Sequence, residues 1–183
     1  ALVVGGEQLS RLMDMTDRST CVLFGDAAGA AVYERDETTD LCVDLGSRGN
    51  LEIEIQGCAR PEPSRIKMNG NAVFRFAVGV IPSSLNRVME KAGLTLDEID
   101  WVVCHQANAR IIDHCAKKMG SAEKFYKNID RYGNTSAASV PLALYDMWQE
   151  GLLKNGQKVL AVGFGGGLTW AGALLNLSLG AAK

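Results

Sequence analysis

The chain has 183 residues, and its content of 47% hydrophobic and 22% charged residues is ordinary for a soluble α/β protein with a substantial core. A formal net charge of −2 excludes the basic footprint of a general nucleic-acid-binding protein, and no apolar run is long enough to span a bilayer. The cysteines are odd in number and no pair has metal-ligand spacing, so the sequence predicts reduced thiols, no metal site and a cytoplasmic location. They are Cys21, Cys42, Cys58, Cys104 and Cys115.

The first forty residues are predicted to contain three strands and a linker. The apolar run at residues 1–5 predicts a buried strand that begins without a cap, as expected of a chain that opens in mid-structure. Strands over residues 20–26 and 28–33 are predicted to form a hairpin, and residues 34–40, rich in Asp, Glu and Thr, to form a linker.

The middle of the chain is predicted to be strands, a loop and one long helical stretch. Alternation over residues 41–55 indicates strands, and residues 59–64 indicate a loop. Apolar residues between positions 70 and 92 have helical spacing, although Pro82 is expected to kink or divide that helix, and Gly93 to end it.

The last part of the chain alternates between predicted strands and helices, which indicates an α/β domain. Strands are predicted over residues 99–104, 125–129, 157–164 and 168–179, and helices over residues 108–119 and 135–150. The first of these helices should stop at Gly120, and the second is apolar on most sides in its first turns, which is typical of a helix buried between layers. The final two strands are joined by a triple glycine.

Three local runs are distinctive, and each lies where a predicted strand or loop ends. They are Trp-Val-Val-Cys-His-Gln-Ala-Asn-Ala-Arg from position 101, Arg-Tyr-Gly-Asn-Thr-Ser-Ala-Ala-Ser-Val-Pro from position 131, and Phe-Gly-Gly-Gly-Leu-Thr-Trp from position 164. Together they resemble the His, Asn and glycine-loop segments of the β-ketoacyl-acyl carrier protein synthase III family of thiolase-fold condensing enzymes. The resemblance extends from the start of the chain to about Leu177.

The resemblance implies a layered α/β, thiolase-like fold with a mixed sheet and a buried helix. Residues 1–34 would then be the end of the N-terminal thiolase-like half, and residues 35–183 the C-terminal half of the duplicated fold. The family also needs a nucleophilic Cys at a helix N-terminus, in a run resembling Ala-Ala-Cys-Ser-Gly, which these residues do not contain. We therefore expect a complementary N-terminal half to supply the Cys, and this chain to be inactive without it.

His105 and Asn134 are the predicted catalytic pair. An imidazole N–H and a carboxamide N–H can hold a negative enolate oxygen without adding a proton to it. A single His after a strand is more often structural, and an Asn after Gly133 is often a helix cap or a turn residue, but the two runs together favour function. The resemblance assigns Gly166 to an oxyanion hole, for which the simpler reading is a tight turn.

A second group of residues is expected to bind the pantetheine arm of coenzyme A or of acyl carrier protein. By resemblance, these are Met68, Gly70, Asn71, Phe74, Ala107 and Asn108, with Arg18 stacking on the adenine at the tunnel mouth. The coenzyme A thioester and phosphopantetheine are substrate carriers, and no cofactor is expected. For Arg18 alone, the plain reading is a solvated loop residue.

Basic residues near the predicted tunnel mouth provide a candidate docking surface for an acidic carrier protein. They are Arg75, Arg110, Lys117 and Lys118. A solvated helix face is the ordinary interpretation of such a cluster, as it is for the mid-helix His114.

The predicted function is a decarboxylative Claisen condensation of an acyl-CoA primer with malonyl-acyl carrier protein, which starts fatty-acid synthesis. The complete enzyme is expected to be a homodimer, without nucleic acid or membrane partners. Two alternatives stay open: a polyketide or quinolone-type condensing enzyme, and an inactive thiolase-fold chain that serves as a binding or structural subunit beside an active partner. None of the cysteines substitutes for the missing nucleophile, since Cys104 should face the core when His105 faces the site, and Cys115 is mid-helix.

Overall fold

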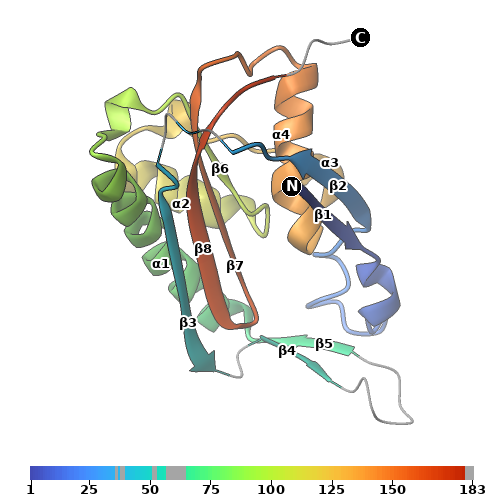
Figure 1. The fold of residues 1–183 in the computed structure, drawn as a ribbon. Coiled ribbons are helices and arrows are strands. Elements are labelled where there is room, and N and C mark those ends of the chain that lie inside the picture. Colours follow the sequence, from blue (N-terminus) through green and yellow to red (C-terminus); the bar gives the residue numbers. More distant parts are fainter. Residues whose placement is uncertain (36, 38–39, 51–52, 57–64, 180–183) are drawn as a thin grey trace.

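A computed structural model of the chain describes residues 1–35, 37, 40–50, 53–56 and 65–179 (Figure 1). At its centre is a four-stranded sheet of order β3-β8-β7-β6, with helices on both faces. β6 is parallel to β7, whereas β8 is antiparallel to both β7 and β3, so the predicted mixed sheet is confirmed. The strands are β3 (Val43–Asn50), β6 (Trp101–Cys104), β7 (Lys158–Gly165) and β8 (Gly167–Asn176). The predicted loop at residues 59–64, Cys58 and part of the linker lie outside the described residues.

One face of the sheet is covered by α1 (Gly70–Ala92) and α2 (Ala109–Met119), as Figure 1 shows. α1 begins at Asn69, whose side chain accepts the Ala72 N–H at 3.1 Å, and it ends at Gly93 in the left-handed conformation. Its buried side chains repeat at helical spacing and pack against the sheet, where they form much of the hydrophobic core. The helix continues through Pro82, so the expectation that it divides there is wrong.

α2 has the boundaries that its capping residues predict. The side chain of Asn108 accepts the Arg110 N–H at 2.8 Å, and Gly120 is left-handed with φ 76°. Ile111, Ile112 and Cys115 form its buried face, which leaves the other face to charged residues. The charged and apolar faces are therefore cleanly separated along this helix.

The opposite face of the sheet packs against α4 (Ser139–Gln149), preceded by the short helix η4 (Ser136–Ala138). α4 lies between the central sheet and a two-stranded ribbon of β1 (Leu2–Glu7) and β2 (Ala27–Val32), so the predicted position between layers is correct. Its Ala143 and Met147 are fully buried, whereas Tyr145 is half exposed.

Two strand predictions at the start of the chain are corrected by the structure. Residues 20–23 form turns and Phe24 makes an isolated bridge to Asn134, so β2 has no hairpin partner there and pairs instead with β1. β1 is not buried, because Leu2, Val3 and Val4 are more than half exposed. The apolar run predicted the strand correctly, but not its burial.

A third strand prediction, over residues 125–129, is also wrong. Phe125 makes one isolated bridge to Val102, and the chain then enters α3 (Ile129–Tyr132). The aromatic residues of this segment favour a strand, but beyond the Tyr126 N–H, which donates to the Val102 carbonyl, the Tyr126 carbonyl and the Asn128 N–H bond to the side chain of Gln106. The remaining elements are η1 (Leu9–Leu12), β4 (Ile53–Gln56), β5 (Arg65–Met68), η2 (Leu96–Glu98) and η3 (Ala122–Lys124). Among the described helices, none combines the length and apolar character needed to cross a membrane.

Candidate active site

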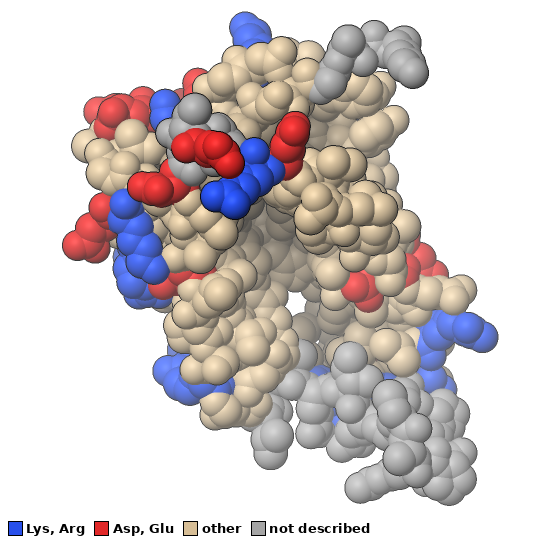
Figure 2. Space-filling model, viewed as in Figure 1, with Lys and Arg blue, Asp and Glu red and all other residues tan. Residues whose placement is uncertain are grey.

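A cavity of about 740 Å³ lies where the ends of β6 and β7 approach the start of α1 and the Asn134 loop. Its size and mainly apolar walls are typical of a small-molecule site. Most of the predicted site residues lie in its wall: His105, Asn134, Gly166, Met68, Gly70, Asn71, Phe74, Ala107, Asn108 and Arg110. These predicted residues, which lie up to 98 positions apart in the sequence, thus surround one space. Figure 2 shows that the molecule is hollowed near the middle of the face in view and that uncharged residues prevail around the hollow.

His105 directly follows β6, and its backbone N–H donates to the Val162 carbonyl at 2.7 Å, which extends the pairing with β7. The side chains of neighbouring strand residues point to opposite faces. Cys104 accordingly lies in the core, fully buried, while the His105 side chain reaches the cavity wall. The imidazole packs edge-on against Phe164, with ring centroids 5.3 Å apart.

The protonation of His105 follows from its burial and from Ser139. Burial lowers the pKa of His105 to about 4, so the ring is neutral at pH 7. Its Nδ1 lies 2.6 Å from the Ser139 hydroxyl oxygen, which also accepts the Gln106 N–H at 3.3 Å. The Ser139 O–H can then donate to Nδ1, and this arrangement leaves the ring proton on Nε2 as a hydrogen-bond donor.

Asn134 is held by its backbone and by its side chain. Its N–H donates to the Leu23 carbonyl at 2.8 Å, and its carbonyl accepts the Gly25 N–H at 2.9 Å. The side-chain oxygen accepts the Ser136 N–H at 2.9 Å, so the amide group is oriented by its acceptor end. The side-chain N–H groups of Asn134 take no part in that contact, so they can donate a hydrogen bond to a ligand oxygen.

The glycine loop joins β7 to β8, and only one of its three glycines needs the conformational freedom of glycine. Gly167 has φ 135°, whereas Gly165 and Gly166 have no positive φ. The simpler reading, a tight turn, therefore explains Gly167 alone. Gly166 lies in the cavity wall, and its carbonyl accepts the Thr169 hydroxyl at 3.2 Å.

The residues that the sequence assigns to pantetheine binding line the cavity, with one exception. Met68 ends β5, Gly70, Asn71 and Phe74 belong to the first turn and a half of α1, and Ala107 and Asn108 precede α2. Arg18 is exposed in the loop after η1 and does not line the cavity, so its predicted place at the mouth is not supported by the cavity wall.

The predicted basic docking set separates into two groups. Arg110, Lys117 and Lys118 all project from α2, and the Arg110 guanidinium lies over the Phe74 ring, 6.0 Å from its centroid, at the cavity wall. Arg75 instead lines a second, smaller cavity with Arg48. His114 is exposed, as expected, although its ring contacts Phe74 edge-on.

In the part of the chain that the structure describes, no cysteine is placed to act as a nucleophile at the cavity. Burial raises the pKa of the Cys104 thiol far above its ordinary value and that of Cys115 to about 11. Both belong to the core, while Cys42 is buried and Cys21 is half-buried beside η1. None of these four is among the residues that line the cavity.

Sequence reasoning missed several residues that shape the site. Ser139 orients His105 from a helix 34 residues away, and no local pattern could reveal that contact. Phe164 was visible beside the glycines but was not assigned a place in the wall. The other missed wall residues are Leu9, Leu23, Phe24, Ile66, Val73, Ile111, Ser136 and Gly165.

Comparisons with known proteins agree with this geometry. The family model described as 3-Oxoacyl-[acyl-carrier-protein (ACP)] synthase III C terminal matches residues 89–177, and the one described as 3-Oxoacyl-[acyl-carrier-protein (ACP)] synthase III matches residues 1–49. The chain is 48% identical to a β-ketoacyl-[acyl-carrier-protein] synthase III of Clostridium acetobutylicum, over 96% of this chain and 58% of that protein. It therefore spans less than two thirds of the length of that relative.

Solved structures show the same likeness. The synthase III of Thermus thermophilus is matched with a TM-score of 0.89 and 44% identity, over 97% of this chain and 59% of that one. The priming β-ketosynthase of the R1128 polyketide pathway is matched with a TM-score of 0.88 and 36% identity, over 96% of this chain and 56% of that one.

The mixed sheet, the helix between layers and these likenesses define a protein of the thiolase fold. The chain belongs to the β-ketoacyl-[acyl-carrier-protein] synthase III family.

Proposed function

We propose that this chain provides the decarboxylating part of a condensing site, in which His105 and Asn134 together hold the oxygen of a malonyl thioester. The observation that supports this most is that both side chains, far apart in sequence, line one cavity, with Nδ1 of His105 beside the Ser139 hydroxyl and the Asn134 side-chain oxygen accepting the Ser136 N–H. Their remaining N–H groups are the donors that a developing enolate needs.

The proposed reaction has two stages. The bond from the malonyl methylene carbon to its carboxylate breaks, carbon dioxide leaves, and the electron pair forms an enolate whose oxygen accepts the two hydrogen bonds. The enolate carbon then attacks the carbonyl carbon of an acyl thioester, and the sulfur leaves as a thiolate. A neutral His105 suits the first stage, because it donates a hydrogen bond without protonating the enolate.

The substrates that we propose are an acyl-CoA primer and malonyl-acyl carrier protein, with no separate cofactor or metal. The wall formed by Met68, the start of α1 and the residues before α2 suits a narrow arm that alternates apolar segments with amides. Asn108 is half-buried at this wall, although its side-chain oxygen already caps α2. Its amide N–H groups would be the part that meets a pantetheine carbonyl.

We further propose that the acyl group is loaded on a cysteine that these 183 residues do not provide. The deep burial and raised thiol pKa values of Cys104 and Cys115 support this. Another polypeptide segment of the complete enzyme would carry this cysteine. We propose that the complete enzyme is a homodimer. The described free thiols support a reducing, cytoplasmic setting.

The purified chain tests this proposal directly. Alone, it should form no β-ketoacyl product from acyl-CoA and malonyl-acyl carrier protein, whereas the chain combined with a cysteine-bearing segment, called the completed enzyme below, should do so. Condensation by the homogeneous chain alone would overturn the assignment of the nucleophile. Failure of the completed enzyme to decarboxylate malonyl thioesters would overturn the proposed role of the cavity.

A second candidate function is priming of polyketide synthesis. The likeness to the R1128 priming β-ketosynthase favours it, since that structure matches the fold of the chain about as well as the synthase III of Thermus thermophilus does. Both functions use the same condensation and differ in the carrier protein. Comparing KM for malonyl groups on fatty-acid and polyketide carrier proteins separates them.

A further inference from the structure

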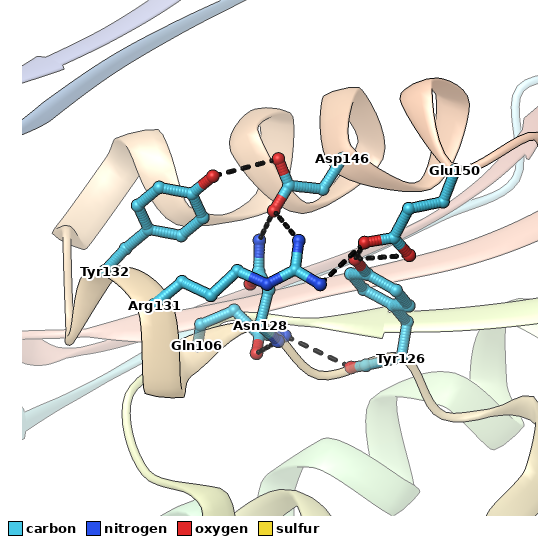
Figure 3. Close-up of polar contacts among 7 residues, drawn as sticks. All are labelled: Gln106, Tyr126, Asn128, Arg131, Tyr132, Asp146 and Glu150. Atoms are coloured by element: carbon cyan, nitrogen blue, oxygen red, sulfur yellow. Dashed lines mark hydrogen bonds and ion pairs between the residues drawn. The ribbon is translucent and has the colours of Figure 1, made fainter.

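α4 is attached to the candidate active site at two points on one face. Ser139 and Asp146 are seven residues apart, close to two helical turns, so their side chains project in nearly the same direction. Ser139 contacts His105 directly. Asp146, only 6% exposed, faces the segment that leads to Asn134 (Figure 3).

The Asp146 carboxylate is bonded to three side chains of that segment. Oδ2 accepts the Asn128 amide at 3.0 Å and the Arg131 guanidinium at 3.2 Å, and Oδ1 accepts the Tyr132 hydroxyl at 3.0 Å. A buried carboxylate is tolerated only when its oxygens are paired, and hydrogen bonds to a charged acceptor are roughly twice as strong as neutral ones. The bonds therefore fix the segment against α4.

Gln106 links the hydrogen bonds of Asp146 to the His105 side of the cavity. It immediately follows His105, is 1% exposed, and donates through Nε2 to the carbonyls of Cys104 at 2.8 Å and Tyr126 at 3.3 Å. Its side-chain oxygen accepts the Asn128 N–H at 3.1 Å. Asn128 is thus bonded to Gln106 through its backbone and to Asp146 through its side chain.

Tyr132 links Asp146 to the Asn134 side of the cavity. It is the last residue of α3, two positions before Asn134, and the Gly133 N–H closes the end of α3 by donating to the Ile129 carbonyl at 2.8 Å. The bond from the Tyr132 hydroxyl to Asp146 therefore sets the direction in which the chain enters Asn134.

Glu150 extends the network at the end of α4, but in a more exposed position. It bonds to the Arg131 guanidinium at 2.8 Å and accepts the Tyr126 hydroxyl at 3.1 Å. Arg131 is about half exposed, so solvent weakens this ion pair. The buried oxygens of Asp146 are the centre of the network.

We propose that Asp146 is a positioning residue that holds the His105 and Asn134 segments in register, so that both donors reach the same substrate oxygen. The expected loss of catalysis in variants of Asp146 rests on the proposed function. The role of Asp146 in fixing the positions of the two segments does not. Among the described residues, Asp146 makes no hydrogen bond to the cavity wall and acts only through Asn128, Gln106 and Tyr132.

Asp146→Asn is the decisive variant. The oxygen of the new amide group can still accept the Tyr132 hydroxyl. Its N–H groups, however, face the N–H donors of Asn128 and Arg131, so those two hydrogen bonds are lost. In the completed enzyme, kcat for malonyl decarboxylation should fall about tenfold or more, because small displacements of aligned groups are costly, while KM changes less than about twofold. The cavity wall that would bind pantetheine is unaltered.

Exchanging the partners provides the rescue. The double variant Asn128→Asp with Asp146→Asn returns a carboxylate to face an amide, and it should bring kcat back to within about threefold of the original. Tyr132→Phe removes one bond without changing charge and should give a smaller loss of kcat, which keeps the proposal testable if Asp146→Asn does not fold.

Asp44→Asn is the matched control. Asp44 is equally buried, at 7%, and pairs with Arg87 at 2.7 Å and with Trp170 at 3.1 Å on the α1 side of the sheet. This variant should lower the unfolding midpoint but leave kcat within about twofold. The proposal is overturned if Asp146→Asn behaves in the same way, with a lower midpoint and an unchanged kcat.

A spectroscopic measurement on the full chain separates this proposal from the proposed function. The side-chain amide signals of Asn134 and the ring nitrogen signals of His105 should both shift in Asp146→Asn, return in the exchanged double variant, and stay in place in Asp44→Asn. Unshifted signals would overturn the positioning role even if the enzyme decarboxylates. Shifted signals in a completed enzyme without decarboxylase activity would support positioning and refute the proposed function.

Discussion

The Ser139 hydroxyl oxygen lies 2.6 Å from Nδ1 of His105, although the two residues are separated by 34 positions and belong to different layers of the fold. Because the same oxygen accepts the Gln106 N–H, the hydroxyl proton is available to Nδ1. The first turn of α4 thereby selects which ring nitrogen of His105 can donate into the cavity.

Ser139→Ala should lower malonyl decarboxylation in the completed enzyme by about tenfold to a hundredfold, since the loss of one orienting hydrogen bond leaves the ring free to place its proton on Nδ1. Nitrogen chemical shifts of the His105 ring report the tautomer directly. Ser139→Thr retains a hydroxyl and should recover most of the rate. An unchanged tautomer in Ser139→Ala would contradict the assignment.

His105→Ala and Asn134→Ala should each reduce decarboxylation and condensation by about two or more powers of ten, because each removes one donor to the enolate oxygen. Acyl transfer to the cysteine should change far less. Single-turnover assays with radiolabelled acyl-CoA and malonyl-acyl carrier protein measure the two stages separately. Decarboxylation at the original rate in either variant would remove that residue from the site.

The stability of the chain should depend on His105 in mildly acidic solution. Burial holds the pKa of His105 near 4 in the folded chain, against 6.5 ordinarily, so the unfolded chain binds the extra proton between these values. The unfolding free energy should therefore fall as the pH drops from about 6.5 to about 4, by on the order of 3 kcal/mol from this residue.

Denaturant unfolding of the original chain and of His105→Gln at pH 7 and near pH 4.5 measures this contribution as the difference in pH dependence. Since the chain has two histidines, His114→Gln leaves the His105 ring as the only one for an NMR titration. A His105 ring that titrates near its ordinary pKa would show that it is exposed to water in solution.

Arg110→Glu combined with Lys117→Glu should raise KM for malonyl-acyl carrier protein in the completed enzyme and leave acyl loading from acyl-CoA nearly intact. Both residues project from α2, and Arg110 reaches the cavity wall over Phe74. Added salt should have the same effect, because exposed charge pairs are screened over roughly 8–10 Å. Arg75→Glu is the control, since Arg75 lines the second cavity and should change KM little. An equal loss with both substrates would indicate a damaged fold.

The helices and the core strands were predictable because their signals are local. Asn108 and Gly120 fix the two ends of α2 through an N-cap side chain and a left-handed residue. The alternation of faces at Cys104 and His105 likewise needs only the period of a strand. His105 and Asn134 could be named from their runs, although the cavity that unites them needed the structure.

The errors have a common physical cause in contacts between distant segments. The aromatic residues of 125–129 have strand propensity, yet the Asn128 N–H bonds to the Gln106 side chain, which no local pattern encodes. The exposure of β1 has the same cause, because the burial of a strand depends on what packs against it. For the same reason, the sequence could not predict the contacts of the Ser139 hydroxyl and of the Asp146 carboxylate.

The backbone pairing between residues 23–25 and Asn134 has a consequence for how the sequence can vary. A Cβ atom on Gly25 would lie only 2.1 Å from the Tyr132 carbonyl oxygen, so the two segments approach closely only because that side chain is absent. In a saturation mutagenesis library of this chain, position 25 should tolerate no residue but glycine, whereas neighbouring Phe24, with its side chain at the cavity wall, should accept other large apolar residues. Position 25 would then look like a catalytic residue in the library while carrying no functional group at all.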